Sequence, residues 1–269
     1  MQPLTLSLIQ TSLVWEDAAA NRSRFDRWFA EVPAASQLVV LPEMFSSGFS
    51  MNSEVIAETM QGATLKWMRQ RSRELNKILC GSLVVEERGH YFNRFVWVAP
   101  VASDNQETMV ISYDKRHLFR MAGEQNHYHP GGEHIIVTAG DWRICPMVCY
   151  DLRFPVWFRN RGDYDLLLCV ANWPQPRQLA WNRLLQARAI ENLSYTVGVN
   201  RVGEDGNNVQ YAGGSAVYDY QGNERLEVFD TEGVFTLTLD GAPLQTFRRR
   251  FPAWQDADDF HLQHGSETL

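Results

Sequence analysis

Short apolar blocks alternate with amphipathic blocks from the beginning of the chain. Residues 4–13 are rich in Leu and Ile and alternate between apolar and polar positions, which predicts a β-strand. Asp17 can cap a following helix that runs through Val32, with Phe25, Trp28, Phe29 and Val32 on one apolar stripe. Residues 37–41 form a short apolar run just before Glu43, and this pattern is typical of a buried strand.

The same alternation continues to residue 239. Helices are expected over residues 64–76, 155–160 and 177–192. Strands are expected over residues 78–85, 91–98, 109–113, 135–138, 142–149, 166–171, 195–200, 214–218 and 234–239. No linker or short-period repeat interrupts this order, so we expect one α/β sandwich domain spanning residues 1–269. The tail from about residue 240 carries aromatic residues without a clear period, and we expect it to pack against its own domain or against a partner subunit.

The charge and the apolar content of the chain argue against several classes of partner. The formal charge of -7 argues against a nucleic-acid partner, which needs a basic face to neutralise phosphates. The run Arg248-Arg249-Arg250 is short and is expected to be solvated. No apolar run approaches the roughly 18 residues of a membrane helix, and the first residues lack the pattern of a signal peptide. We therefore expect a cytoplasmic protein whose four cysteines are reduced.

Three polar residues stand at the ends of apolar runs, where catalytic groups collect in folds of this class. They are Glu43, Lys115 and Cys149. Taken singly, each has an ordinary interpretation as a surface carboxylate, a solvated lysine or a small core residue. Cys149 differs from the other cysteines because the chain turns polar directly after it. This location, near the N-terminus of a following helix, would favour the thiolate.

Together the three residue types suit nucleophilic attack on an amide carbonyl. A thiol nucleophile needs a base within hydrogen-bond reach, about 2.6–3.2 Å. Glu43 could take the thiol proton and later activate water. Lys115 could stabilise the oxyanion of the tetrahedral intermediate, joined by the backbone N–H of Tyr150.

Three motifs, in this order, resemble the catalytic blocks of the nitrilase superfamily of carbon–nitrogen hydrolases. They are Leu41-Pro42-Glu43, Tyr113-Asp114-Lys115-Arg116-His117-Leu118-Phe119 and Cys149-Tyr150-Asp151-Leu152-Arg153-Phe154-Pro155. The helix over 183–192 and the turn Gly213-Gly214-Ser215 are also similar to segments of the family, so the resemblance covers nearly the whole chain. It implies a four-layer αββα sandwich and a Glu-Lys-Cys triad that acts through a covalent thioester.

The resemblance also implies further site residues. Many members have a second glutamate shortly after the lysine. Glu124 stands in that neighbourhood and could orient Lys115 or the substrate, with Glu133 as the competing choice.

The chain length, the block from Cys149 to Arg153 and residues 251–258 look like the bacterial omega-amidases. Those enzymes hydrolyse the terminal amide of 2-oxoglutaramate and related monoamides of dicarboxylates. The resemblance makes Arg153 a candidate for binding the free carboxylate, although a capping or ion-pairing role is the alternative. Val156 and Trp173 depart from common family forms near the expected pocket. Trp173 is therefore included among the substrate-binding candidates, and the exact substrate stays open.

Rival functions are hydrolysis of a nitrile, an N-carbamoyl compound or another amide, and a non-catalytic binding protein of the same fold. The residues His127, His129 and His134 could suggest a zinc site. They lie in a Gly/Pro-rich loop, so we expect a substrate-lining or surface loop and no metal. No Gly-rich phosphate loop precedes a helix, and no cofactor is expected. The aromatic tail and the family's habit of pairing sandwiches predict a homodimer or a higher homo-oligomer.

Overall fold

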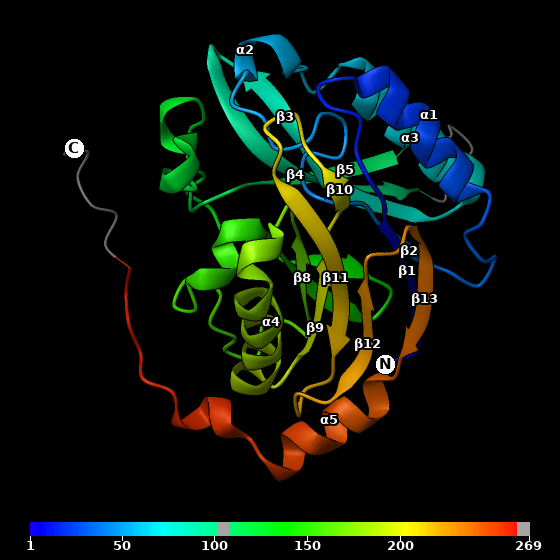
Figure 1. Ribbon diagram of the computed structural model, residues 1–269. Helices are drawn as coiled ribbons and strands as arrows, with labels where there is room; N and C mark the ends of the chain where they lie inside the picture. The colour runs from blue at the N-terminus through cyan, green and yellow to red at the C-terminus, as the bar shows by residue number, and fades with distance from the viewer. Residues whose placement is uncertain (102–107, 263–269) are drawn as a thin grey trace.

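The computed structural model describes residues 1–101 and 108–262, and it contains two mixed β-sheets that pack face to face (Figure 1). The first sheet has the strand order β13-β1-β2-β3-β4-β5. Its strands are β1 (Leu4–Gln10), β2 (Leu38–Val40), β3 (Ile78–Glu87), β4 (His90–Pro100), β5 (Thr108–Asp114) and β13 (Gly233–Leu239). Strands β1, β2 and β3 run parallel, and the other neighbours in this sheet are antiparallel.

The second sheet has the order β10-β11-β9-β8-β7-β6, with β12 paired to β11. Its strands are β6 (Val137–Ala139), β7 (Trp142–Val148), β8 (Leu166–Val170), β9 (Tyr195–Val199), β10 (Val202–Glu204), β11 (Gln210–Tyr218) and β12 (Glu224–Phe229). The parallel strands β7, β8 and β9 form its centre.

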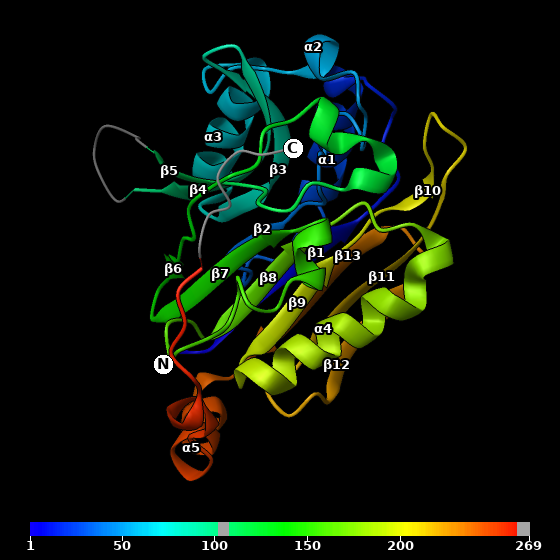
Figure 2. The same cartoon turned by 90° about the vertical axis from the view of Figure 1, so that its left-hand side faces the viewer.

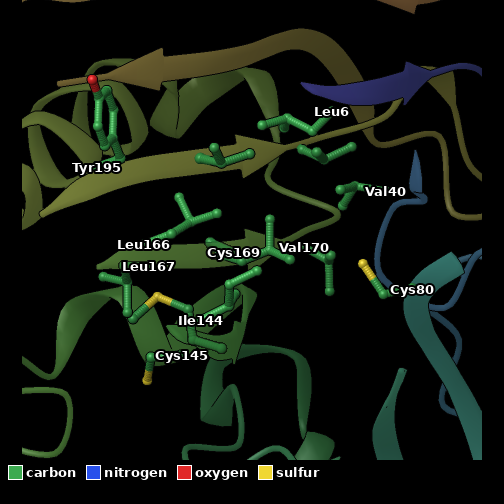
Figure 3. Close-up of a cluster of buried hydrophobic side chains, with 14 of the residues drawn as sticks. Leu6, Val40, Cys80, Ile144, Cys145, Leu166, Leu167, Cys169, Val170 and Tyr195 are labelled. Atoms are coloured by element: carbon green, nitrogen blue, oxygen red, sulfur yellow. The ribbon is translucent and has the colours of Figure 1, made fainter. Parts of the chain in front are cut away.

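The two-residue period of the strands separates the core between the sheets from the layers outside them. In β2, Leu38 and Val40 belong to the core between the sheets, whereas Val39 packs with the helices outside. In β4, Phe95 and Trp97 likewise face the inner core. Cys80 lies in register with Val40 on the same inner face, and Cys145 and Cys169 are also fully buried in the hydrophobic core (Figure 3). These three cysteines thus occupy the core positions expected for them.

Helices cover the outer face of each sheet, which completes a four-layer αββα sandwich (Figure 2). Helices α1 (Ala18–Phe29) and α3 (Ala63–Leu75) cover the first sheet, where Phe25 and Met68 are buried against strand residues. Helix α4 (Gln178–Asn192) covers the second sheet through Trp181 and Leu185. A short helix, α2, spans Ser53–Ile56. Within the described part of the chain, no helix is long and apolar enough to cross a membrane.

The expected fold class is confirmed, and most expected elements agree with the structure to within a few residues. Asp17 caps α1 by accepting a hydrogen bond from the N–H of Ala20 at 2.9 Å. The helix expected over 155–160 is wrong, because the chain forms turns there. The strands β10 and β12 were not expected. Both are short or half-exposed and lack a clear apolar alternation, so their pairing with β11 defines them.

The end of the chain contains a helix that the sequence pattern did not reveal, α5 (Gly241–Arg250). It packs on its own domain through buried Leu244 and through Phe247, whose ring centroid lies 4.9 Å from that of Tyr220. The expectation of a solvated arginine run is wrong for Arg248, which is buried. Its Nη1 lies 2.6 Å from a carboxylate oxygen of Asp165, and this ion pair makes burial of the guanidinium possible.

Candidate active site

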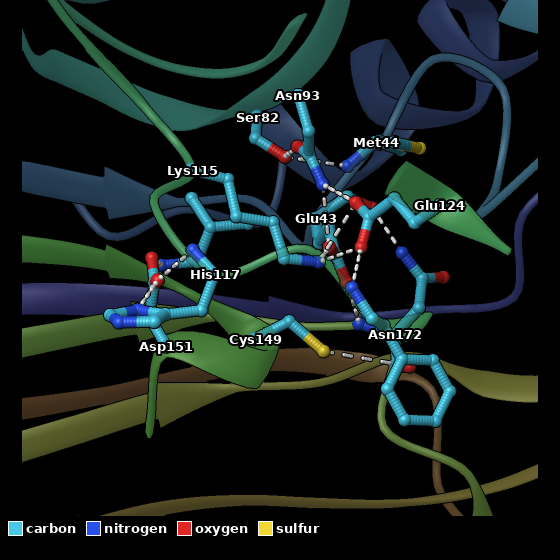
Figure 4. A network of polar contacts seen from close by, with 12 residues as sticks. Glu43, Met44, Ser82, Asn93, Lys115, His117, Glu124, Cys149, Asp151 and Asn172 are labelled. Carbon is cyan, nitrogen blue, oxygen red and sulfur yellow. Dashed lines mark hydrogen bonds and ion pairs between the residues drawn. The ribbon is translucent and has the colours of Figure 1, made fainter. Parts of the chain in front are cut away.

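Glu43 lies just beyond β2, and its carboxylate is completely buried (Figure 4). The next residue, Met44, has a φ of 41°, so the chain turns sharply there. Oε1 of Glu43 accepts a hydrogen bond from Asn93 Nδ2 at 2.7 Å, and Oε2 accepts one from the backbone N–H of Asn172 at 2.7 Å. The side chain of Asn172 also donates to the backbone carbonyl of Glu43 at 2.6 Å. Residues from both sheets therefore hold this carboxylate in place.

Lys115 follows β5, and its ammonium group lies between two carboxylates. Nζ is 3.0 Å from Oε1 of Glu43, and it is 3.0 and 2.9 Å from the two oxygens of Glu124. All three side chains are fully buried. Burial alone would lower the pKa of Lys115, but the charges of Glu124 and Glu43 outweigh it and hold that pKa well above its usual range. Lys115 is thus a fixed cation.

Glu124 is the glutamate that the structure brings to Lys115, while Glu133 is exposed. Glu124 begins a short 3-10 helix (Glu124–Asn126), and its Oε2 also accepts a hydrogen bond from the N–H of Phe119 at 2.5 Å. Burial raises the pKa of Glu124, and the charge of Glu43 adds to this, while Lys115 opposes it. Two carboxylates and one ammonium group therefore share a site that excludes water.

Cys149 stands at the tip of a sharp bend between β7 and a 3-10 helix (Cys149–Arg153). Its φ of 47° lies in the left-handed region, which costs a non-glycine residue about 1–3 kcal/mol. The bend places Cys149 in the wall of a cavity. Sγ lies 3.9 Å from the backbone carbonyl oxygen of Asn172.

The protonation state of Cys149 differs from the expectation. Burial raises the pKa of the thiol well above its usual range, and Glu43 adds to this, whereas Lys115 lowers it. No long helix follows whose N-terminus could stabilise a thiolate, because the 3-10 helix begins at Cys149 itself. The thiol is therefore neutral at rest and needs a base to become a nucleophile.

Asp151 is a site residue that sequence reasoning missed. Its buried carboxylate accepts hydrogen bonds from the Tyr113 hydroxyl at 2.8 Å and from the N–H groups of His117 at 2.9 Å and Val148 at 3.1 Å. The ring Nδ1 of His117 lies 2.8 Å from the same carboxylate. Asp151 thus joins the segment around Lys115 to the bend at Cys149. Its position two residues after the cysteine was the available signal.

A cavity of about 470 Å³ opens beside Cys149. Both expected substrate-binding residues, Arg153 and Trp173, line it, as does Tyr150. Arg177 also lines the cavity and was missed, because nothing in its local sequence distinguishes it. Most of the wall is aromatic or apolar, which suits a small organic molecule held by a few polar groups.

The histidine loop lies apart from this cavity. His127 and His129 are exposed, and the His129 ring packs against that of His90 at 4.0 Å between centroids. His134 contacts the thiol of Cys145 at 3.2 Å instead of joining them. Among the residues that the structure describes, no group of three or more His, Cys, Asp or Glu side chains is arranged to hold a metal ion.

A buried Glu-Lys-Cys cluster in an αββα sandwich is the arrangement expected for a carbon–nitrogen hydrolase, and comparison with known proteins agrees. The sequence model of the carbon-nitrogen hydrolase family matches residues 5–249. The chain therefore belongs to this family, within the nitrilase superfamily, and it is an amide-hydrolysing enzyme.

Individual relatives are similar over almost their full length. The omega-amidase YafV of Escherichia coli is 45% identical over 267 residues, covering 97% of this chain and 100% of the relative. The 2-oxoglutaramate amidase of Bacillus subtilis is 25% identical, covering 94% and 96%. The crystal structure of XC1258 from Xanthomonas campestris, a CN-hydrolase superfamily protein with an arsenic adduct in its active site, superposes with a TM-score of 0.92. It is 44% identical and covers 98% of this chain and 100% of its own.

Proposed function

We propose that this enzyme hydrolyses the omega-amide of a small 2-oxo dicarboxylate monoamide such as 2-oxoglutaramate and releases ammonia. The observation that carries the proposal is the cavity that Cys149 lines, which has arginine side chains in its wall. Behind it, the buried ion pair of Glu43 and Lys115 acts on the Cys149 thiol. The 45% identity to an omega-amidase over the whole chain supports the same substrate class.

In the proposed first step, Glu43 removes the proton from the Cys149 thiol as Sγ attacks the amide carbon. The raised pKa of the thiol makes this base necessary, because little thiolate is present before attack. The negative charge that develops on the amide oxygen is stabilised by Lys115 and by the backbone N–H of Tyr150. Lys115 is suited to this role because its raised pKa keeps it charged.

Collapse of the tetrahedral intermediate breaks the C–N bond, and the proton held by Glu43 passes to the leaving nitrogen, so that ammonia departs. A thioester on Cys149 remains. Glu43 then takes a proton from water as the water oxygen attacks the thioester, and the free acid and the thiol are regenerated. Glu124 holds Lys115 in position through two hydrogen bonds of 3.0 and 2.9 Å.

Arg153 is proposed to bind the free carboxylate of the substrate. It is exposed at the cavity wall, and its guanidinium group lies 5.0 Å from the ring centroid of Trp173. A carboxylate that loses water on binding needs a cation or several donors, and a planar guanidinium can supply two parallel hydrogen bonds. Trp173 would fix the plane of this guanidinium.

The test is ammonia release from 2-oxoglutaramate, succinamate, glutamine, a nitrile and an N-carbamoyl amino acid. The proposal expects the monoamides of dicarboxylates to have the highest kcat/KM. Cys149→Ala should abolish turnover. Cys145→Ala, which removes another thiol of the same strand region, is the matched control and should retain turnover because the triad stays intact. A preference for the nitrile or the carbamoyl compound would refute the substrate class, and turnover by Cys149→Ala would refute the nucleophile.

We further propose that the enzyme works in the cytoplasm as a homodimer or a higher oligomer. Apolar side chains at the surface support association: Phe251 is 56% exposed and Val156 is 51% exposed. Light scattering at micromolar concentration should report at least a dimer. A monomer with full activity would contradict the oligomer.

A further inference from the structure

Two arginines from different segments line the cavity beside Cys149. Arg153 ends the 3-10 helix that begins at the cysteine, and Arg177 ends a second 3-10 helix (Gln175–Arg177) that leads into α4. Arg177 has no role in the mechanism described above. Because Arg177 lines the same wall as Arg153, it can contact the same ligand.

Trp173 connects the two arginines. Its indole Nε1–H donates a hydrogen bond to the backbone carbonyl of Arg177 at 2.8 Å, and its ring lies beneath the guanidinium group of Arg153. The guanidinium group of Arg177 lies 5.1 Å from the ring centroid of Phe119. Aromatic rings restrain the planes of both guanidinium groups and leave their N–H edges free to donate.

Neither guanidinium group is neutralised by the protein. No ion pair among residues 1–101 and 108–262 involves Arg153 or Arg177, and the side-chain hydrogen bond of Arg177 is a 3.9 Å contact with the sulfur of Met121. Within this part of the chain, Asp205 is the one carboxylate that lines the cavity.

The carboxylate of Asp205 is already occupied. It accepts hydrogen bonds from the N–H groups of Asn207 and Val209 at 2.8 and 3.0 Å, and from the Tyr211 hydroxyl at 2.9 Å. The wall therefore has an excess of positive charge and of unused donors. An anionic group of the ligand can satisfy both.

We propose that Arg177 is a specificity-determining residue that acts with Arg153 as the second half of one carboxylate anchor. A carboxylate offers about four acceptor sites on two oxygens, so two guanidinium groups can bind one carboxylate together. The anchor selects monoamides that carry an anion at the end away from the amide. This inference rests on the proposed function and adds to it the residue that enforces charge selection.

The experiment compares glutaramate with pentanamide, its neutral counterpart in which a methyl group replaces the carboxylate. In Arg177→Met, we expect KM for glutaramate to rise roughly 10- to 100-fold, the range typical of a lost hydrogen bond to a charged group. The value of kcat should change little, since the anchor binds the end of the substrate away from the amide and leaves the triad unchanged. Kinetics with pentanamide should stay the same. Arg177→Lys should show an intermediate KM, because lysine restores the charge without the planar fork.

Arg183→Met is the matched control. Arg183 is exposed on α4 and does not line the cavity, so this variant removes the same charge from the whole protein without changing the site. It should keep the wild-type KM for both substrates. The double variant Arg153→Met/Arg177→Met should lose less than the product of the two single losses, because both residues bind one group. Unfolding temperature and the rate of Cys149 alkylation verify that each variant is folded.

Two results overturn the inference alone: an Arg177→Met variant that keeps its preference for glutaramate, or one that loses activity equally on both substrates. Strictly multiplicative losses in the double variant overturn the shared anchor. If the wild-type enzyme itself prefers pentanamide, the proposed function fails, and the anchor fails with it. The wild-type measurement therefore separates the two failures.

Discussion

Replacing Glu124 by Gln should damage both stability and catalysis, although the side chain keeps its size. Every described partner of the Glu124 carboxylate is a donor: Asn93 Nδ2 and Lys115 Nζ at Oε1, and Lys115 Nζ with the Phe119 N–H at Oε2. The amide of Gln has one oxygen and one NH₂ group. In either orientation the NH₂ group faces donors, and at least one buried donor loses its acceptor.

The magnitude follows from this count. A buried donor without a partner costs about 1–3 kcal/mol, and the lost hydrogen bond to charged Lys115 contributes about 1.5–3 kcal/mol. Lys115 keeps Glu43 at 3.0 Å, so the loss stays below that of an ammonium group left alone. We expect the free energy of unfolding to fall by about 2–4 kcal/mol. The value of kcat should fall by ~10²–10³, as for the loss of one oxyanion donor, because Lys115 is no longer held in place.

Urea unfolding followed by tryptophan fluorescence measures the first effect, and ammonia release measures the second. The pH dependence of Cys149 alkylation adds a readout that a purely structural role would not change. Removal of a negative charge from the buried cluster favours the thiolate, so the apparent pKa of the thiol should move down. Glu133→Gln is the matched control, because Glu133 is exposed. Wild-type stability and kcat in Glu124→Gln would refute this account of the cluster.

Four further predictions concern other groups. Burial raises the pKa of Cys149, so the rate of its alkylation by iodoacetamide should still increase with pH above the usual thiol pKa of about 8.5. A rate that stops increasing near neutral pH would contradict a neutral resting thiol. Asp151→Asn should lower kcat ~10- to 100-fold, because it weakens the hydrogen bonds that join the segment around Lys115 to the bend at Cys149. Unchanged steady-state kinetics would contradict this role of Asp151. Arg248→Met should lower the free energy of unfolding by about 2–4 kcal/mol, because the carbonyl of Leu193 loses its side-chain donor and Asp165 loses its ion pair with Arg248, although Asp165 keeps Arg143 and the Tyr164 carbonyl keeps Asn160. Arg249→Met, at an exposed position, should have almost no effect on denaturant unfolding. Exhaustive chelation should leave ammonia release unchanged. If a chelator abolishes activity and added zinc restores it, the thiol mechanism is incomplete.

The local pattern of the sequence determined the layers of this protein. Alternating and apolar runs predict strands wherever one or both faces are buried, as in β1 and β8, and Asp17 marks the beginning of α1 as expected. The three catalytic candidates were also visible, because each stands where an apolar run ends and the chain turns polar. Periodicity and chain breaks are local properties, so they can be read without knowing what packs against what.

Tertiary structure decided the properties that depend on residues distant in sequence. Glu43 and Lys115 are 72 residues apart, and only the packing of the strands that precede them brings their charges to 3.0 Å. The choice of Glu124 over Glu133, the contribution of Asp151 and the position of Arg177 depend on such contacts in the same way. The raised pKa of Cys149 follows from burial, which no local pattern reveals. Helix α5 and the buried Arg248 were missed because their partners, Tyr220 and Asp165, belong to other elements. Burial and charge pairing are long-range properties, and they determine the chemistry of the site.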